Sequence, residues 1–324
     1  MVGTGARGAV GVLVGLLVLT GLAGCGPAAP GAGPTGPSST VPSSTGPSST
    51  VPSSTVTASP GLPPGLTFEV EIAQRRTERV SRVVVLEVRN TGPVDVTVTG
   101  AALTSDLVGG TATEGREVAA GSMRRVAVPL GPASCGPDAD GDPVASVALD
   151  VTTADGRSGT VVVTPTDRTD DLRRIHGEDC AAAAVARGLR VALADELAVR
   201  DVDGAAVADM TLRVEPVPGG PHVRLVAVLG TTLLRPPGAD ADWVLDVDSA
   251  APPPGGLVVL PAVPARCDLH AIAEDKRGTV LGVRAVVDGV EQPVFHVAAS
   301  DALRGALYDA VLAACGVPTD TRSG

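Results

Sequence analysis

The segment from Cys267 to Thr279 holds the densest group of side chains that could do chemistry, and it reads Cys-Asp-Leu-His-Ala-Ile-Ala-Glu-Asp-Lys-Arg-Gly-Thr. It combines a histidine, acids, the only lysine of the chain and an arginine, which together could contact a polar ligand. The candidate binding residues are His270, Glu274, Asp275, Lys276 and Arg277. The alternative is a short helical turn capped by Asp268 with locally paired charges, because runs of charged residues usually form solvated surface.

The rest of the chain offers only weak patterns for metal or catalytic chemistry. Asp138, Asp140 and Asp142 place three carboxylates in a glycine-containing loop, and calcium favours such oxygen donors. The closing glutamate of a twelve-residue calcium loop is absent, which favours a simple polar turn. The four histidines lack the close spacing of zinc ligands, and the motifs Gly-x-Ser-x-Gly, Gly-Lys-Ser/Thr and Cys-x-x-Cys do not occur. We therefore expect no metal, no cofactor and no catalytic residue, although a triad built from distant residues leaves no motif.

A different kind of chemistry is indicated at Cys25. Residues 1–24 carry a basic residue, Arg7, and then an apolar run from Ala9 to Leu22 that is too short to span a bilayer. The sequence Leu-Ala-Gly-Cys at 22–25 resembles the lipobox of bacterial lipoproteins. The resemblance implies cleavage before Cys25 and diacylglycerol on its sulfur, and two or three acyl chains anchor a protein stably. The alternatives are an ordinary signal peptide or a membrane anchor that stays attached.

Composition excludes some classes of partner. The chain has 25 Lys and Arg against 36 Asp and Glu, a formal net charge of −11, which argues against binding to nucleic acid. It contains only four aromatic residues, so large stacking surfaces for sugars or bases are nearly absent. Cores must be built from Val, Leu and Ala.

The segment that follows Cys25 indicates a tether. Residues 36–55 repeat Pro-Ser-Ser-Thr four times, preceded alternately by Gly and Val, and residues 26–66 show no apolar periodicity. Such a sequence cannot bury a core and stays solvated. We therefore expect residues 25–66 to form a disordered spacer between the membrane and the folded part.

From residue 67 onward, the alternation of apolar and polar residues predicts β-strands. Phe68, Val70 and Ile72 alternate with acids, and continuous apolar runs such as 83–88 and 161–163 are typical of fully buried strands. Turn sequences such as Asp-Gly at 155–156, 203–204 and 288–289 separate these runs. Many short strands with regular turns predict an all-β fold of antiparallel sandwiches. The segment 83–92 resembles a strand and turn of bacterial immunoglobulin-like modules.

An internal repeat divides this part in two. A cysteine precedes an Asp-Gly turn by 20 residues in the first copy and by 21 in the second, and a β run, a helix with Leu-Arg and a second cysteine follow in each. The repeat predicts two tandem sandwich domains, 67–185 and 186–316, each ending in a short disulfide-tethered helix, with a disordered tail at 317–324. The resemblance of 83–92 implies that these domains are immunoglobulin-like. Ser300 can cap the second helix, whose apolar face is expected to comprise Leu303, Leu307, Val311 and Ala314.

The repeat also selects a disulfide pairing. Four cysteines remain once Cys25 is lipidated, and four cysteines allow three pairings. Only Cys135–Cys180 and Cys267–Cys315 place each bond at equivalent points of the two copies, with separations of 45 and 48 residues. Outside the membrane these cysteines are expected to be oxidised.

The motif Cys-Asp-x-His-Ala-x-Ala-Glu-Asp-Lys-Arg-Gly-Thr resembles one found in a family of uncharacterised actinobacterial secreted proteins and lipoproteins. The resemblance extends loosely over both copies, including 172–180, and implies no activity. We therefore expect a lipoprotein on the extracytoplasmic face of the membrane that acts as a non-catalytic accessory module and binds a cell-envelope protein. The alternatives are a secreted enzyme with a site near His270 and a purely structural spacer.

Overall fold

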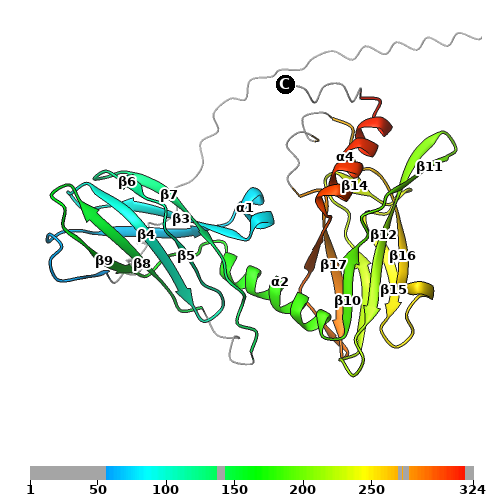
Figure 1. Ribbon diagram of the computed structural model, residues 1–324, viewed down its shortest axis with the longest axis horizontal. Coiled ribbons are helices and arrows are strands. Elements are labelled where there is room, and N and C mark those ends of the chain that lie inside the picture. Colours follow the sequence, from blue (N-terminus) through cyan, green and yellow to red (C-terminus); the bar gives the residue numbers. More distant parts are fainter. Residues whose placement is uncertain (1–55, 137–142, 269–271, 273–276, 318–324) are drawn as a thin grey trace, which may run out of the picture. The chain divides into compact units, whose positions relative to one another are not determined.

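The computed structural model describes residues 56–136, 143–268, 272 and 277–317, and these residues are mostly β-structure (Figure 1). All sheet pairings between named strands are antiparallel. The predicted all-β, sandwich-like fold with two disulfides is therefore confirmed. No helix within these ranges is both long and apolar enough to cross a membrane.

The first β region packs two sheets face to face. One has the order β2-β3-β7, and the other has the order β1-β9-β8-β4-β5, with β6 also paired to β4. Its elements are β1 (Val56–Ala58), β2 (Phe68–Ala73), α1 (Arg76–Ser81), β3 (Val83–Asn90), β4 (Val96–Ser105), β5 (Gly110–Ala112), β6 (Arg116–Val118), β7 (Met123–Pro129), β8 (Ala145–Thr153), β9 (Ser158–Val163) and the helix α2 (Asp171–Ala186). The predicted alternation in β2 is confirmed, because Phe68, Val70 and Ile72 are buried.

The second β region also consists of two sheets, each with five strands. Its sheets have the orders β10-β12-β16-β14, with β11 on β12, and β15-β13-β17-β18, with β19 on β17. Its elements are β10 (Leu189–Leu193), β11 (Ala198–Val202), β12 (Ala205–Pro216), β13 (Val223–Val228), β14 (Leu234–Arg235), β15 (Trp243–Asp248), the 3-10 turn η1 (Pro254–Gly256), β16 (Leu257–Pro264), β17 (Val280–Val287), β18 (Val290–Glu291), β19 (Phe295–Ala298) and α4 (Asp301–Ala314).

The two regions share one strand order. The order β2-β3-β7 corresponds to β10-β12-β16, and β4-β8-β9 corresponds to β13-β17-β19. In each region one strand that precedes β7 or β16 in the sequence, β5 in the first region and β15 in the second, pairs with β4 or β13. In constant-type immunoglobulin domains the equivalent strand instead joins the first, second and fifth strands.

Each region has its own hydrophobic cluster, and α2 contributes to both. Leu172 and Ile175 belong to the cluster of the first region, whereas Ala181 and Val185 belong to that of the second. The described residues all belong to one compact unit of the chain. The predicted domain boundary at 185/186 lies at the end of α2. Because α2 packs into both clusters, the division into two domains at this point stays a prediction.

Two of the predicted Asp-Gly turns close two-residue hairpins. Val202 pairs with Ala205 around Asp203-Gly204, and Val287 pairs with Val290 around Asp288-Gly289. Both residues of each turn have positive φ, 54° and 82° in the first and 48° and 82° in the second. Asp and Gly tolerate this conformation, and the turn matches the natural twist of a hairpin.

Both predicted disulfides are present and the predicted cap of α4 is confirmed. Cys135 is bonded to Cys180 and Cys267 to Cys315. The Leu303 N–H donates to Ser300 Oγ at 3.2 Å. The predicted apolar face is wrong at one position. Ala314 is exposed, because it lies in the last turn of α4 beyond the buried Val311.

The predicted boundary of the tether at residue 66 is also wrong. Val56 to Ala58 form β1 and pair with β9, and Leu66 is buried in the first cluster. The edge of β9 offers free backbone groups to an extended chain, so even a Pro/Ser/Thr-rich segment can add a strand there. Residues 1–55, including the predicted signal and Cys25, lie outside the described part, as do residues 318–324 of the expected tail.

Candidate binding site

The polar face of α2 is organised around Asp171 and Arg174. The buried Asp171 carboxylate accepts hydrogen bonds from the Gln74 backbone N–H at 2.9 Å, from Thr169 Oγ1 at 2.8 Å and from Arg174 Nη2 at 2.7 Å. Arg174 also donates to Gln74 Oε1 at 2.6 Å and to Glu178 Oε1 at 3.0 Å. The spacing of these residues, i to i+3 and i to i+4, places them on one side of the helix.

The protonation state of Asp171 follows from these contacts. Burial acts to raise the pKa of this carboxyl group, but the hydrogen bonds from Arg174, Thr169 and Gln74 outweigh it and hold the pKa below the usual 3.8. The group is therefore ionised at neutral pH. It fixes Arg174 and, through it, the position of Glu178.

His296 on β19 connects α2 to Arg277, which belongs to the charged segment from Cys267 to Thr279. Arg277 Nη2 donates to His296 Nε2 at 2.9 Å, and His296 Nδ1 lies 3.6 Å from Glu178 Oε2. Because a guanidinium has no acceptor, Nε2 must carry the lone pair and Nδ1 the hydrogen. Burial lowers the pKa of His296; Glu178 acts against this and Arg277 adds to it. The imidazole is therefore neutral at neutral pH.

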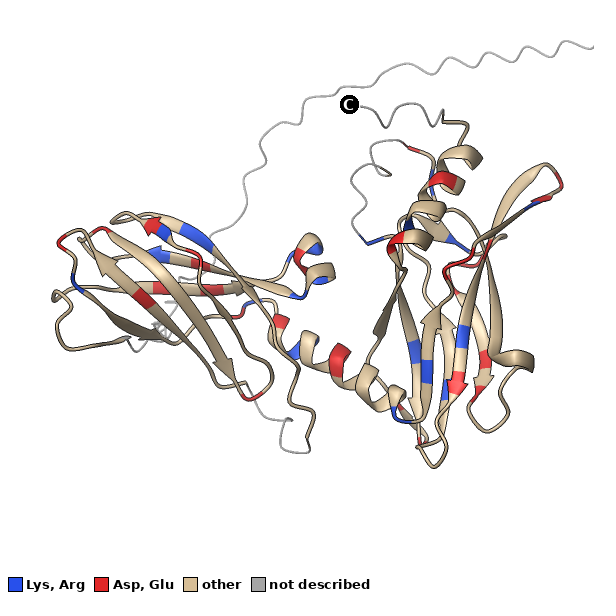
Figure 2. Ribbon diagram, viewed as in Figure 1, with Lys and Arg blue, Asp and Glu red and all other residues tan. Residues whose placement is uncertain are grey.

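A cavity of about 270 Å³ lies beside this network. Arg82 forms an ion pair with Asp179 and donates to the Gly131 carbonyl at 2.8 Å. The polar residues that line the cavity are Gln74, Arg79, Arg82, Glu178, Asp179, Arg277 and His296. Apolar side chains complete its wall, and they are Val80, Leu130, Ile175, Ala182, Val280 and Ala298. Both signs of charge appear on α1 and α2 in Figure 2.

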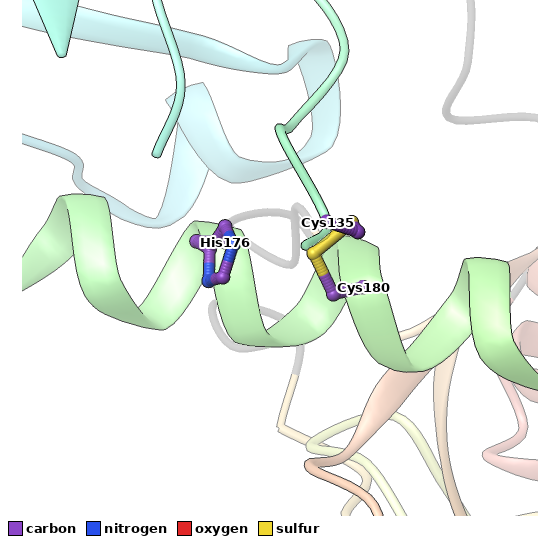
Figure 3. Close-up of side chains that lie close together, drawn as sticks. All are labelled: Cys135, His176 and Cys180. Carbon is purple, nitrogen blue, oxygen red and sulfur yellow. A yellow bond between two sulfur atoms is a disulfide. The ribbon is translucent and has the colours of Figure 1, made fainter. Parts of the chain in front are cut away.

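A second cluster of potential metal ligands lies on the other side of α2. The ligand atoms of Cys135, His176 and Cys180 lie within 4.8 Å of one another (Figure 3). Both sulfurs are joined in the disulfide, and metal binding needs free thiolates. His176 Nε2 lies 2.9 Å from the Ser134 carbonyl, which can only accept, so Nε2 carries the hydrogen. In the oxidised protein this cluster holds the 134–136 loop on the helix and offers no metal site.

The structure describes one of the five predicted binding residues. Arg277 is half-buried and lines the cavity. His270, Glu274, Asp275 and Lys276 lie outside the described residues, as do Asp138, Asp140 and Asp142 of the possible calcium loop. Sequence reasoning did not identify the network of α2. The spacing of Asp171, Arg174 and Glu178 within one helix could have indicated it.

Comparisons with known proteins add no argument about function. No protein-family model and no curated protein sequence matches this chain. Among solved structures, an exo-chitosanase from Amycolatopsis orientalis matches at 16% identity with a TM-score of 0.17, covering 71% of this chain and 26% of the enzyme. The sporulation control protein Spo0M from Bacillus subtilis matches at 12% identity with a TM-score of 0.16, covering 79% of this chain and 95% of its own. This chain therefore spans about a quarter of the length of the exo-chitosanase, and such TM-scores do not establish a common fold.

Proposed function

We propose that the protein is a lipoprotein, anchored through Cys25 to the extracytoplasmic face of the cell membrane, whose β regions act as a non-catalytic binding module. The two disulfides indicate an oxidising compartment outside the cytosol. The Leu-Ala-Gly-Cys sequence at 22–25 supports processing and lipidation at Cys25. The Pro-Ser-Ser-Thr repeats then act as the spacer between the anchor and β1.

The observation that supports a binding role is the rigid mounting of α2. Its buried residues pack into both hydrophobic clusters, and the Cys135–Cys180 disulfide ties its middle to the loop after β7. The two polar residues that α2 contributes to the cavity, Glu178 and Asp179, are therefore held in fixed positions before any partner arrives. Such preorganisation lowers the entropy cost of binding. We propose that a cell-envelope component occupies this surface.

Anchoring is tested with the full chain produced in a bacterium that processes lipoproteins. Cells are grown with a radioactive fatty acid, and the wild type is compared with Cys25→Ser. The wild type should carry the label and sediment with membranes, and Cys25→Ser should lose the label. Equal labelling of both proteins, or no labelling of either, would contradict the anchor.

The binding role is tested by chemical crosslinking of intact cells, with Cys25→Ser as the control for membrane placement. The proposal expects one or more envelope proteins to be crosslinked reproducibly to the wild type through residues around α2. A chain that is anchored but crosslinks to nothing in repeated experiments would instead favour the structural spacer.

A further inference from the structure

The strand β16 has an open edge over most of its length. It pairs with β12 on one side through residues 257–262, whereas on the other side the two-residue strand β14 reaches only Val263 and Pro264 (Figure 1). Among the residues that the structure describes, no strand pairs with 257–262 on this second side. An edge of this kind offers backbone N–H and C=O groups to a further strand.

The pairing with β14 shows which backbone groups point outward. The Ala265 N–H donates to the Leu233 carbonyl, on the β14 side, at 2.9 Å. The register of β16 has no shift, and the residues of an antiparallel strand face its two neighbours alternately, so the odd-numbered residues face the open side. Leu257 and Val259 therefore present two N–H and two C=O groups there. Within the described part of the chain, no hydrogen bond to these four groups is found.

The open edge is short and apolar. Pro261 ends it, because proline has no N–H and its carbonyl already accepts a hydrogen bond from Trp243 Nε1 at 2.6 Å. The residues Leu257 and Val259 are 49% and 56% exposed. No residue of β16 is charged. The strand therefore lacks the charged side chains that commonly protect an edge from pairing with another chain.

The corresponding strand of the first β region, β7, differs in this respect. It carries Arg124 and Arg125, and both are exposed. Pairing of β7 with its own copy would place like charges side by side, which is unfavourable. Pairing of β16 with its own copy places only apolar side chains together. The charge pattern therefore favours a second copy of the chain as the partner of β16.

We propose that two copies of this chain associate through β16, paired antiparallel about a two-fold axis at Val258. In this register Leu257 of each copy lies opposite Val259 of the other. The two N–H groups of each copy then reach the two C=O groups of the other, which gives four backbone hydrogen bonds. A register that places Val259 opposite its own copy sets Leu257 against Pro261, which has no N–H, and loses hydrogen bonds. The apolar side chains of Leu257 and Val259 cover each other across the two strands.

An edge pairing of this length already exists within the chain. β1 pairs with the edge of β9 through three residues, Val56 to Ala58. Between separate chains such a short pairing gives a weak dimer, whose population rises with protein concentration. Anchoring of many copies to one membrane would raise their effective concentration. The inference goes beyond the proposed function, because the partner is the protein itself.

The test places a cysteine at the proposed axis of the purified full chain. Val258→Cys sets two thiols opposite each other at a position without hydrogen bonds, where the Cα atoms of paired strands lie about 4.5 Å apart, close enough for a disulfide. Val290→Cys, at a 63% exposed position on β18, is the matched control for random collisions. All variants carry Cys25→Ser, so that the introduced cysteine is the one outside the two disulfides.

Each variant is oxidised with a copper–phenanthroline complex at increasing protein concentration in detergent solution, and the dimer is measured on a non-reducing gel. We expect Val258→Cys to give about tenfold more dimer than Val290→Cys at equal concentration, which corresponds to about 1.4 kcal/mol of specific association. Equal yields of dimer from the two variants would overturn the proposal.

Val259→Lys, added to Val258→Cys, tests the edge itself. The side chain at 259 is already exposed, so the fold tolerates the change. In the dimer the two lysines lie near the axis and replace an apolar contact, and we expect the yield of dimer to fall about tenfold. Val290→Lys in the same background should leave the yield unchanged.

An unchanged yield with Val259→Lys would also overturn the proposal, because the dimer would then form through another surface. The experiment uses purified chains without a lipid anchor or a second protein. Its outcome is therefore independent of fatty-acid labelling and of crosslinking to envelope proteins, which test the proposed function.

Discussion

At the scale of single residues, Asp171 shows how a buried charge is stabilised in this fold. Replacing it with alanine leaves Arg174 without its buried partner and the Gln74 N–H without an acceptor. We expect Asp171→Ala to lower the free energy of unfolding by about 3 kcal/mol at neutral pH. Asp170→Asn is the control, because no hydrogen bond of the Asp170 side chain caps the helix and Asn tolerates its positive φ. Urea denaturation measures both variants, and equal midpoints would contradict this account.

The same residue predicts a pH dependence with a definite sign. The folded-state pKa of Asp171 is lowered from 3.8, so the folded protein binds fewer protons than the unfolded chain in this range. The stabilisation is complete above the unfolded value and is lost as the pH falls through the folded value. The difference between the wild type and Asp171→Ala should therefore shrink below about pH 4. A constant difference down to strong acid would contradict the ionised state.

Asp155 provides a second test at this scale, without any claim about stability. Thr153 Oγ1 and the Arg157 guanidinium donate to its carboxylate and lower its pKa from 3.8 to about 2. Thr153→Val removes the larger of these contributions, so the pKa should move back towards 3.8. Thr152→Val, a change at the adjacent threonine that contacts Ser158, should leave it unchanged. NMR titration of the Asp155 carboxyl carbon distinguishes the outcomes, and a pKa that stays low in Thr153→Val contradicts the assignment.

At the scale of elements, α4 depends on its cap. Ser300 Oγ accepts the hydrogen bond of the Leu303 N–H in the first turn. Ser300→Ala should cost about 1 kcal/mol of stability, whereas Ser300→Thr retains the oxygen and should recover most of it. Thermal denaturation gives the comparison. Identical melting temperatures for Ser300→Ala and the wild type would show that the cap does not stabilise the helix.

The second disulfide fixes the other end of α4. Cys267 and Cys315 are 48 residues apart, and closing a loop of this length is worth about 4 kcal/mol in the chain-entropy model. The double variant Cys267→Ser/Cys315→Ser should lose stability of this order and expose the last turn of α4 to hydrogen exchange. Peptide mapping without reductant provides the control, since a bond between Cys135 and Cys267 would refute the pairing.

Local patterns explain why the elements could be predicted from sequence. Strand alternation such as Phe68, Val70 and Ile72 follows from local spacing, and the turn Asp288-Gly289 follows from the conformations those residues tolerate. The disulfide pairing was predictable because the repeat restricts it. β1 was not predictable, because its pairing with β9 joins residues more than 100 positions apart and its own sequence has little apolar pattern.

The candidate site was predictable only in part, for the same reason. Arg277 was identified from its unusual neighbours in the sequence. Its contact with His296, and the contact of Gln74 with Asp171 across 97 positions, depend on which elements the fold brings together. The pattern of apolar and polar residues within a single helix or strand does not predict contacts between elements.

At the scale of the whole molecule, the two β regions share a strand order, a terminal helix and an equivalent disulfide. They differ in the use of the helix. The described contacts of α2 include both hydrophobic clusters, whereas those of α4 include the second cluster alone. The helix of the first copy, α2, therefore packs against both β regions and also carries polar residues. Two of these, Glu178 and Asp179, line the cavity beside α2.

The central claim is that the chain is exported and anchored through Cys25. The most direct test is the intact mass of the native protein purified from bacterial membranes. We predict a chain that begins at Cys25, carries diacylglycerol and acyl groups, and lacks the four hydrogens removed by two disulfides. A mass that corresponds to a chain beginning at Met1, with no fatty groups and with reduced cysteines, would contradict the account.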